Sequence, residues 1–190
     1  MLKLKKVAIT GGVASGKSTV CQLFQKLGAY VVSADAIAHE LLDPNTDLGR
    51  QIHTLLGVIS RQKIAEIVFR DPKKLHELEQ ILHPEILKRI ESEYELALRA
   101  GGYTLFVVEM PLLFEIGAES FYDVTIAVIT EEPLAKKRFG EEYDRRMRRQ
   151  WAPEKKAEKA NYTIKNNGSL KDLEIQVKKL NATLTGESHP

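Results

Sequence analysis

Cysteine and tryptophan are scarce in this sequence, with one of each among its 190 residues. A single cysteine, Cys21, permits neither an intrachain disulfide nor a metal site built from several cysteines. Cys21 lies in a stretch of helical spacing after a glycine-rich segment, where an inert and partly buried thiol is the usual state. These counts exclude a disulfide-stabilised scaffold and a cysteine-based metal domain.

Long apolar runs are absent as well. No stretch approaches the roughly 20 residues that a helix needs to cross a bilayer. Near the N-terminus, the apolar stretch Val7–Ile9 is too short for a signal peptide, although lysines precede it. We therefore expect a cytoplasmic protein that does not bind a membrane.

The sequence also has little net charge, +2 at pH 7 from 28 basic and 26 acidic residues. This value is too small to indicate nucleic-acid binding by itself. With 43% hydrophobic and 28% charged residues, the composition is that of an ordinary globular protein. The length allows one α/β domain with a sizeable core and small insertions.

Short strand-like runs alternate with helical spacing along the chain. The candidate strands are Lys3–Thr10, Ala29–Ala34, Tyr103–Val108, Asp123–Ile129 and Tyr162–Ile164. Gly16–Leu27 has apolar residues at helical intervals, and Ser169 is placed to cap a final amphipathic helix. Strands that alternate with helices imply a parallel sheet covered on both faces. We predict an α/β fold with a three-layer core around a five-stranded parallel sheet.

The region Asn45–Ala100 contains no strand-like run. It is rich in Leu, Ile, Glu, Lys and Arg, and it is interrupted by Asp71-Pro72 and His83-Pro84. A residue that precedes proline is disfavoured in the α region, so each of these dipeptides predicts a helix boundary. We expect a helical insertion of three or four helices.

A glycine-rich loop joins the first predicted strand to the first predicted helix. It reads Gly11-x4-Gly16-Lys17-Ser18, the pattern of a phosphate-binding P-loop. Backbone N–H groups of such a loop surround phosphate oxygens, the lysine reaches the β- and γ-phosphates, and the serine hydroxyl holds Mg²⁺. A glycine turn that binds nothing is disfavoured, because the pattern matches at every fixed position. The predicted nucleotide-binding residues are Gly12, Ala14, Ser15, Gly16, Lys17, Ser18 and Thr19.

Two acidic residues follow predicted strands, where crevices form at the carboxyl ends of a parallel sheet. Asp35, after the second strand, can orient or deprotonate an attacking hydroxyl, but it can equally serve as a helix N-cap. Glu109, at the end of the third strand, resembles a Walker B carboxylate near Mg²⁺, with a solvated strand-end acid as the alternative. The segment after Glu109 enters the same crevice, and we predict that its residues Pro111, Leu112, Leu113 and Glu115 bind the substrate.

A basic segment follows the fourth predicted strand and contains seven cations: Lys136, Lys137, Arg138, Arg145, Arg146, Arg148 and Arg149. Arginines of a mobile lid can neutralise the charge that develops during phosphoryl transfer. A solvated helix face, with or without RNA contact, is the alternative. Because the chain also carries the glycine loop, we favour a lid.

Several longer motifs together resemble the dephospho-CoA kinase family, over nearly the whole chain. They are TGGVASGKST at Thr10–Thr19, LGAYVVSADAIA at Leu27–Ala38, LHPEI at Leu82–Ile86, VVEMPLLFE at Val107–Glu115, RRQ at Arg148–Gln150 and ANYTIKNNG at Ala160–Gly168. Many kinases share the glycine loop, whereas the His-Pro dipeptide and the Pro-Leu-Leu-x-Glu segment are more specific. Three differences from the family pattern are Ser33 in place of a first aspartate and shortened segments at Gly57–Val58 and Phe139–Gly140.

The resemblance implies a kinase that transfers the ATP γ-phosphate to the ribose 3′-hydroxyl of dephospho-CoA, with ATP and Mg²⁺ as cofactors. It places Asp35 against that hydroxyl and His83 and Pro84 at the mouth of an acceptor-binding domain. It also assigns Arg138 and Arg146 to the lid. We expect no nucleic-acid or membrane partner, and a monomer or weak homo-oligomer.

The same resemblance places Asn166 and Gly168 near the adenine. It divides the chain into a P-loop NTPase core at 1–44, 101–132 and 160–185, a helical acceptor-binding insertion at 45–100 and a helical lid at 133–159.

Two other classes of protein stay open. Another small P-loop kinase, such as a nucleoside monophosphate kinase, shares the loop, the helical insertion and the lid, but it explains His83-Pro84 and Pro111-Leu112-Leu113 less well. A nucleotide-binding switch or RNA-associated module is disfavoured, because the Asn-Lys-x-Asp motif of GTPases is absent from the sequence.

Overall fold

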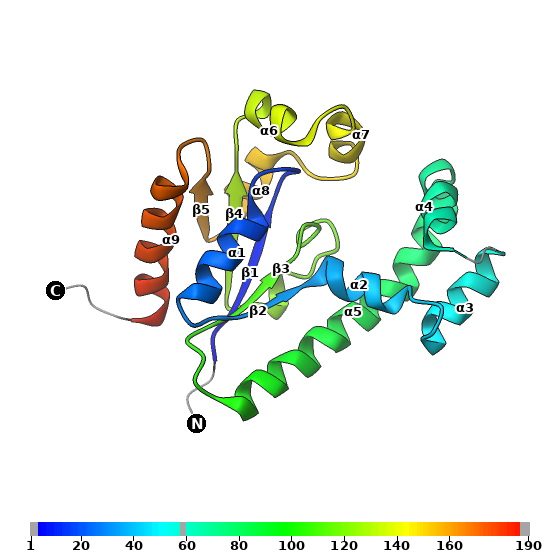
Figure 1. Cartoon of the computed structure of the whole chain (residues 1–190), viewed down its shortest axis with the longest axis horizontal. Coiled ribbons are helices and arrows are strands. Elements are labelled where there is room, and N and C mark those ends of the chain that lie inside the picture. The colour runs from blue at the N-terminus through cyan, green and yellow to red at the C-terminus, as the bar shows by residue number, and fades with distance from the viewer. Residues whose placement is uncertain (1–3, 58–59, 187–190) are drawn as a thin grey trace. The chain divides into compact units, whose positions relative to one another are not determined.

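A computed structural model describes residues 4–57 and 60–186 of the chain (Figure 1). The chain forms two compact units, one from Met1–Ser33 with Leu96–Pro190 and the other from Ala34–Glu95. We call them the core unit and the helical unit. Within the described residues, no helix combines the length and apolarity needed to cross a membrane.

The core unit contains a five-stranded sheet with every neighbouring pair parallel. Its strands are β1 (Lys6–Gly11), β2 (Tyr30–Ser33), β3 (Phe106–Glu109), β4 (Val124–Ile129) and β5 (Tyr162–Lys165), in the order β2-β3-β1-β4-β5. The apolar sequences of β1, β3 and β4 suit strands that are buried on both faces. The predicted α/β fold with a five-stranded parallel sheet is confirmed.

Strand register brings three sequence-distant segments to one edge of this sheet. Ile9 of β1 and Ser33 of β2 both pair with Glu109, the last residue of β3. The chain segments that leave these strands therefore start side by side at the carboxyl ends, where α/β sheets bind ligands.

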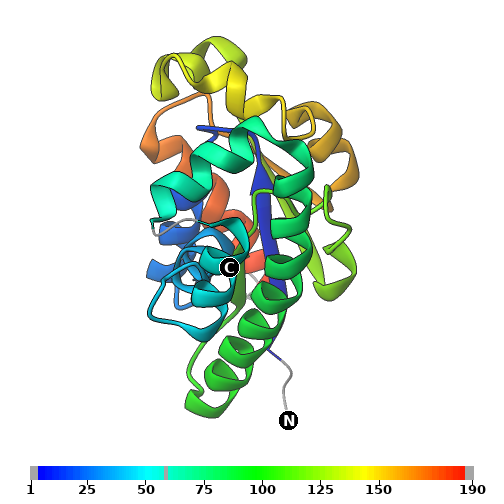
Figure 2. The same ribbon diagram turned by 90° about the vertical axis from the view of Figure 1, so that its right-hand side faces the viewer.

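Helices cover both faces of the sheet (Figure 2). On one face, α1 (Lys17–Lys26) and α9 (Leu170–Thr185) share a buried cluster that includes Phe24 and Val177. On the other, α8 (Pro153–Lys159) contacts β1 and β4. The basic segment forms α6 (Glu132–Phe139) and α7 (Tyr143–Met147), and the short helix η1 (Glu119–Phe121) precedes β4.

Ser169 caps the start of α9, as the sequence predicted. Its Oγ accepts a hydrogen bond from the backbone N–H of Asp172 at 3.2 Å, and Asp172 Oδ2 accepts from the backbone N–H of Ser169 at 2.9 Å. This reciprocal capping box satisfies two N–H groups at the helix start. The hydrogen bonds from Ser169 lower the pKa of the Asp172 carboxyl.

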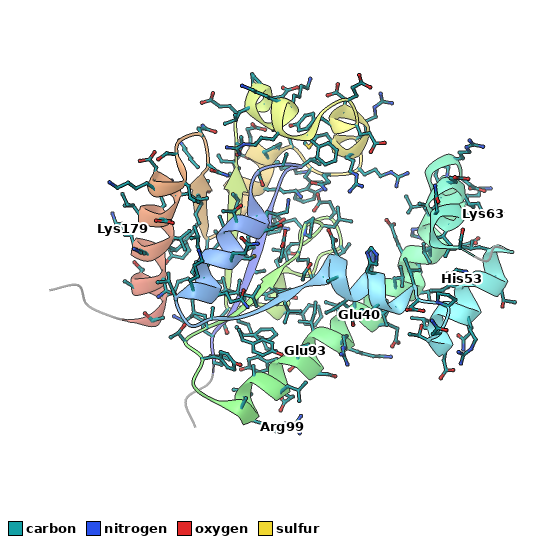
Figure 3. All side chains as sticks on the ribbon, in the orientation of Figure 1. Glu40, His53, Lys63, Glu93, Arg99 and Lys179 are labelled. Carbon is teal, nitrogen blue, oxygen red and sulfur yellow. The ribbon has the colours of Figure 1, made fainter. Side chains whose placement is uncertain are left out.

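The helical unit consists of α2 (Ala34–Leu41), α3 (Asp47–Leu56), α4 (Arg61–Arg70) and most of α5 (Pro72–Ala100). Its own apolar cluster includes Ile52, Ile64 and Leu78, one residue from each of the last three helices. His53, labelled in Figure 3, is buried on α3 and bonds through Nε2 to the Leu42 carbonyl at 3.1 Å. Among the described residues of 45–100 there is no strand, as predicted.

The helix boundary predicted at His83-Pro84 is wrong. Pro72 does begin a helix, but Pro84 lies inside α5. Proline has no N–H for the Gln80 carbonyl, which costs about 3 kcal/mol in a helix interior. Leu82 before Pro84 and Ile90 after it are both buried, and this packing stabilises helix on both sides. Tertiary contacts thus override the local preference of the dipeptide.

Candidate active site

The predicted phosphate-binding loop connects β1 to α1, as expected. Gly11 and Gly16 have positive φ angles of 147° and 92°, which favour glycine. A Cβ at Gly11 would lie 2.1 Å from the Val128 carbonyl oxygen, and one at Gly16 would lie 2.2 Å from Asn166 Nδ2. Both glycines are therefore required by close packing inside the protein as well as by the loop conformation.

The loop presents polar groups that suit a polyphosphate. No side chain caps the N-terminus of α1 in the structure described, so its first N–H groups face the loop without a side-chain acceptor. Ser15 Oγ is buried without a hydrogen-bond partner among the described atoms. Because a buried hydroxyl without a partner is costly, this atom fits a site that a phosphate oxygen or a water completes.

Lys17 lies over the loop that precedes it. Its Nζ donates to the carbonyl oxygens of Gly12 at 2.8 Å and Gly11 at 3.3 Å. The ammonium group thus lies beside the N–H groups of the loop. In this position it can neutralise charge on the β- and γ-phosphates of a bound nucleoside triphosphate.

Ser18 and Glu109 are brought together, as the metal-site prediction requires. The Ser18 hydroxyl donates to Glu109 Oε1 at 2.9 Å. No group of three or more His, Cys, Asp or Glu side chains in the described residues could hold a metal. A hydroxyl and one carboxylate suit Mg²⁺, which is held by few protein groups together with phosphate oxygens and water.

A pocket of about 280 Å³ lies beside the loop in the core unit. It is lined by Ala14, Gly16, Thr19, Arg138, Asn166, Gly168, Leu170 and Leu173. Asn166 and Gly168, predicted to lie near the adenine, therefore share a pocket with the phosphate-binding loop. Asn166 Nδ2 also donates to the Ser15 carbonyl at 2.8 Å, which joins the pocket wall to the loop.

Arg138 forms part of this pocket wall. Its Nη2 donates to the Asn166 carbonyl at 3.2 Å and its Nη1 to Thr130 Oγ1 at 3.4 Å. Arg146 lies elsewhere, on α7, with its guanidinium carbon 5.6 Å from the centre of the Phe139 ring. The two predicted lid arginines thus have different surroundings, since Arg138 lies at the pocket and Arg146 is exposed on α7.

Sequence reasoning missed three residues around the pocket. The helical spacing of Leu170 and Leu173 predicts only core packing by the apolar face of a helix. Thr130 was not singled out. It is buried, and its Oγ1 lies within hydrogen-bond distance of the carbonyl oxygens of Ser15 at 3.2 Å and Asn166 at 3.1 Å. Its position directly after β4, at the ligand-binding edge of the sheet, was the available signal.

The segment after β3 contains the predicted crevice residues. Leu113 is fully buried, whereas Pro111 and Leu112 are half-buried. Glu115 Oε1 accepts hydrogen bonds from the Trp151 backbone N–H at 2.7 Å and from Lys156 Nζ at 2.9 Å. The Trp151 ring stacks on Phe114, with centroids 6.2 Å apart, so Trp151 anchors the end of the basic segment to the core.

The predicted acceptor-side residues Asp35, His83 and Pro84 belong to the helical unit. Asp35 is exposed at the second position of α2, which begins at Ala34, so it lies beyond the N-cap position. Burial lowers the pKa of His83 on α5, with Glu79 acting in the opposite direction and His76 in the same direction. The roles of these residues in acceptor binding stay predictions.

Cys21 is buried in α1. Burial, together with the negative charge of Glu109, raises the pKa of its thiol far above the ordinary value, and Lys17 offsets this only in part. The neutral thiol is a poor nucleophile, in line with the inert role expected from the sequence.

Comparison with known proteins shows the family to which the chain belongs. The model of the dephospho-CoA kinase family matches residues 5–172. This range includes the glycine loop, the helical unit and the basic segment.

Two curated relatives match almost the whole chain. A dephospho-CoA kinase of Chlamydia pneumoniae is 41% identical over 200 aligned positions, covering 98% of this chain and 99% of the relative. A dephospho-CoA kinase of Protochlamydia amoebophila is 38% identical over 195 positions, with 95% and 96% covered. Because the first alignment has 200 positions and this chain 190 residues, the relative contains residues that this chain lacks.

Solved structures are also similar to this chain. The crystal structure of TT1252 from Thermus thermophilus has a TM-score of 0.79 at 31% identity, covering 98% of this chain and 99% of that one. A dephospho-CoA kinase from Campylobacter jejuni has a TM-score of 0.71 at 28% identity, covering 96% and 98%. A shikimate kinase from Acinetobacter baumannii, at 15% identity and a TM-score of 0.52, shares the fold alone. The chain is therefore a kinase that belongs to the dephospho-CoA kinase family.

Proposed function

We propose that this enzyme transfers the γ-phosphate of ATP to the ribose 3′-hydroxyl of dephospho-CoA, giving coenzyme A and ADP. The observation that carries the donor half is the assembly of Lys17, Ser18 and Glu109 around one glycine loop. The acceptor is proposed from the names of the relatives, which match over nearly their full length.

The core unit would bind the nucleotide along its loop and pocket. N–H groups of the loop and the start of α1 would surround the phosphates, and the pocket beside Asn166 would receive the adenine. The guanidinium of Arg138, fixed by Asn166 and Thr130, would place a positive charge at the edge of that pocket.

We propose that Ser18 and Glu109 hold Mg²⁺ together with the phosphates. When bound, the ion neutralises charge on the β- and γ-phosphates and orients them for in-line transfer. Lys17 would add positive charge on the same side. Its Nζ would exchange the carbonyl oxygens of Gly11 and Gly12 for phosphate oxygens.

In the transfer step, the 3′-hydroxyl oxygen bonds to the γ-phosphorus while the bond from that phosphorus to the β,γ-bridging oxygen breaks. The hydroxyl proton must leave, and we propose that the Asp35 carboxylate accepts it. Asp35 is exposed at the start of α2, so its side chain is accessible to an acceptor.

We further propose that residues 45–100 bind the acceptor and that 133–159 form a lid that excludes water. We propose acceptor contacts for His83 and Pro84 of the helical unit. We propose the same role for Pro111, Leu112 and Leu113 of the core unit. Arg146 would act only after the lid closes, because at present it lies over Phe139. We propose that the enzyme acts in the cytoplasm as a monomer or weak homo-oligomer, without a membrane or nucleic-acid partner.

An acceptor panel tests the proposal. ADP formation is measured with dephospho-CoA, nucleoside monophosphates and shikimate, each with and without Mg²⁺. We expect ADP formation only with dephospho-CoA and Mg²⁺, and incorporation of one phosphate into the acceptor by mass spectrometry. Phosphorylation of a nucleoside monophosphate or shikimate, without reaction of dephospho-CoA, would contradict it.

A further inference from the structure

Lys156 is a charged side chain with no solvent exposure. It belongs to α8, on the opposite face of the sheet from α1 (Figure 2). A buried ammonium group is strongly unfavourable unless partners replace the lost water. The partners of Lys156 therefore indicate what this residue does.

The Nζ atom of Lys156 has two partners, both in the segment that follows β3. It donates to the Pro111 carbonyl at 2.5 Å and pairs with Glu115 Oε1 at 2.9 Å. Burial lowers the pKa of Lys156, and the hydrogen bond that Lys156 donates to Glu115 offsets part of that effect. The two contacts span the turn from Pro111 to Glu115 and hold its ends to one helix.

The Pro111 carbonyl connects this pair to the phosphate-binding loop. It also accepts from Thr10 Oγ1 at 3.1 Å, and Thr10 immediately precedes the loop's first glycine. Met110, which precedes Pro111, donates its backbone N–H to the Ile9 carbonyl at 2.9 Å. Lys156 thus stabilises the carboxyl ends of β1 and β3, where the glycine loop begins and where Glu109 lies.

Glu115 connects the same pair to the end of the basic segment. Its Oε1 also accepts from the Trp151 backbone N–H at 2.7 Å, and its Oε2 is buried without a partner among the described atoms. The Lys155 ammonium lies 3.7 Å from the centre of the Trp151 ring. Oε1 is thus engaged by two protein donors, and Oε2 is buried away from the surface, so neither oxygen is accessible to a substrate.

We propose that Lys156 and Glu115 are positioning residues for phosphoryl transfer, and that Glu115 does not bind the acceptor. Together they fix the turn after β3 so that Glu109 and the glycine loop keep their alignment. This inference rests on the proposed function of the site and replaces the substrate-binding role that the sequence suggested for Glu115.

Four variants test this inference: Lys156→Met, Glu115→Gln, the double variant, and Lys159→Met as a control. Lys159 also lies on α8 and pairs with an acidic residue, Glu119, but it is 42% exposed. Misalignment acts on the transition state more than on ground-state binding, so we expect turnover to fall about tenfold in each single variant. KM values for ATP and dephospho-CoA should change less than about threefold. The turnover of the Lys159→Met control should stay close to wild type. This variant is a control for turnover alone, because Lys159 Nζ lies 5.3 Å from the centre of the Trp151 ring.

The double variant tests whether the two residues act as one unit. If they do, its turnover should equal that of the slower single variant rather than the product of both losses. Multiplicative losses would show that Lys156 and Glu115 act independently, which would overturn the inference.

Trp151 supplies a readout that needs no substrate, because it is the only tryptophan in the chain. Its backbone N–H bonds to Glu115, so loss of either partner should shift its emission and increase quenching by acrylamide. Circular dichroism and thermal melting establish that each variant folds. If Lys156→Met does not fold, Glu115→Gln, which keeps the size of the side chain, supplies the test.

Two further results would overturn the inference. One is unchanged turnover and unchanged Trp151 emission in both folded single variants. The other is a rise of about tenfold or more in the KM for dephospho-CoA in Glu115→Gln alone, at normal turnover, which would make Glu115 an acceptor-binding residue. If the wild type does not phosphorylate dephospho-CoA at all, the proposed function fails, and the Trp151 measurements still test the pairing.

Discussion

The Ser18 hydroxyl donates a hydrogen bond of 2.9 Å to Oε1 of Glu109, across 91 positions of sequence. The pairing of Ile9 with Glu109 brings the end of β3 beside the start of the glycine loop, and the loop returns to Ser18 in the first turn of α1. The fold thus places the hydroxyl next to the carboxylate. A site arranged in advance in this way needs little reorganisation during the reaction.

Replacing Glu109 by glutamine tests the proposed metal role. Glu109→Gln keeps an oxygen that can accept from Ser18 but removes the negative charge. We expect the Mg²⁺ concentration for half-maximal activity to rise about tenfold, because Mg²⁺ is held by carboxylates. ATP binding in EDTA, measured by calorimetry, should not change. An unchanged Mg²⁺ dependence would assign Glu109 to hydrogen bonding with Ser18 alone.

Lys17→Ala should nearly abolish phosphoryl transfer. The substitution removes the charge that we place beside the β- and γ-phosphates, and loss of one such group typically lowers turnover about 10²- to 10³-fold. The hydrogen bonds that it removes include those from Lys17 Nζ to the carbonyl oxygens of Gly11 and Gly12, and we expect the fold to persist. Single-turnover kinetics and a thermal melt together check this. A variant that keeps more than about a tenth of wild-type turnover would contradict the role.

Asp35→Asn should sharply reduce turnover while ATP still binds. Asparagine preserves the size of the side chain but is not a base, and loss of a general base typically costs about 10²- to 10⁴-fold. Rapid-quench kinetics measure the chemical step, and calorimetry measures ATP affinity. Near-normal turnover would leave Asp35 with a structural role at the start of α2.

Gly16→Ala should destabilise the protein more than Gly186→Ala. Both glycines adopt the left-handed αL conformation, with φ angles of 92° and 74°, so alanine is strained by about 1–2 kcal/mol at either position. Only at Gly16 does the new Cβ meet another group, Asn166 Nδ2, and that amide is held by the Ser15 carbonyl. We expect a further loss of about 1–3 kcal/mol in the free energy of unfolding, with weaker ATP binding. Equal losses in urea titrations of the two variants would contradict this account.

The free energy of unfolding should decrease as pH falls through the titration range of His83. Burial lowers its pKa in the folded protein below the ordinary value of about 6.5, so the unfolded chain takes up the proton first. The loss begins near the unfolded pKa and levels off below the folded pKa. Urea titrations of wild type and His83→Asn at several pH values measure it. The same pH dependence in both proteins would show that His83 does not contribute.

The sheet and the phosphate-binding loop could be predicted because their sequence signals are local. Apolar runs such as Phe106–Val108 indicate buried strands, and the spacing of Gly11, Gly16 and Lys17 identifies the loop. The helix boundary predicted at His83-Pro84 does not occur, because buried residues on both sides of Pro84 stabilise one continuous helix. Local preference decides a structure only where tertiary packing does not oppose it.

The surroundings of Lys156 could not be predicted from the sequence. Lys156 stands among charged residues in Glu154–Lys159, a pattern typical of a solvated helix face. Its burial depends on Pro111 and Glu115, which belong to a distant segment. Thr130 was missed for a similar reason, since its hydroxyl acquires a role only when β4 and β5 lie side by side.

The close contacts of Gly11 with Val128 and of Gly16 with Asn166 affect how the glycine-loop motif should be interpreted in other sequences. Side chains are excluded at both positions by neighbouring protein atoms, whether or not phosphate ever binds. A descendant that lost its catalytic activity but kept this packing would retain both glycines. Lys17 and Ser18, which no such packing requires, would be free to diverge. In this chain, the lysine and serine are thus the better evidence of catalysis, and the glycines are evidence of the fold.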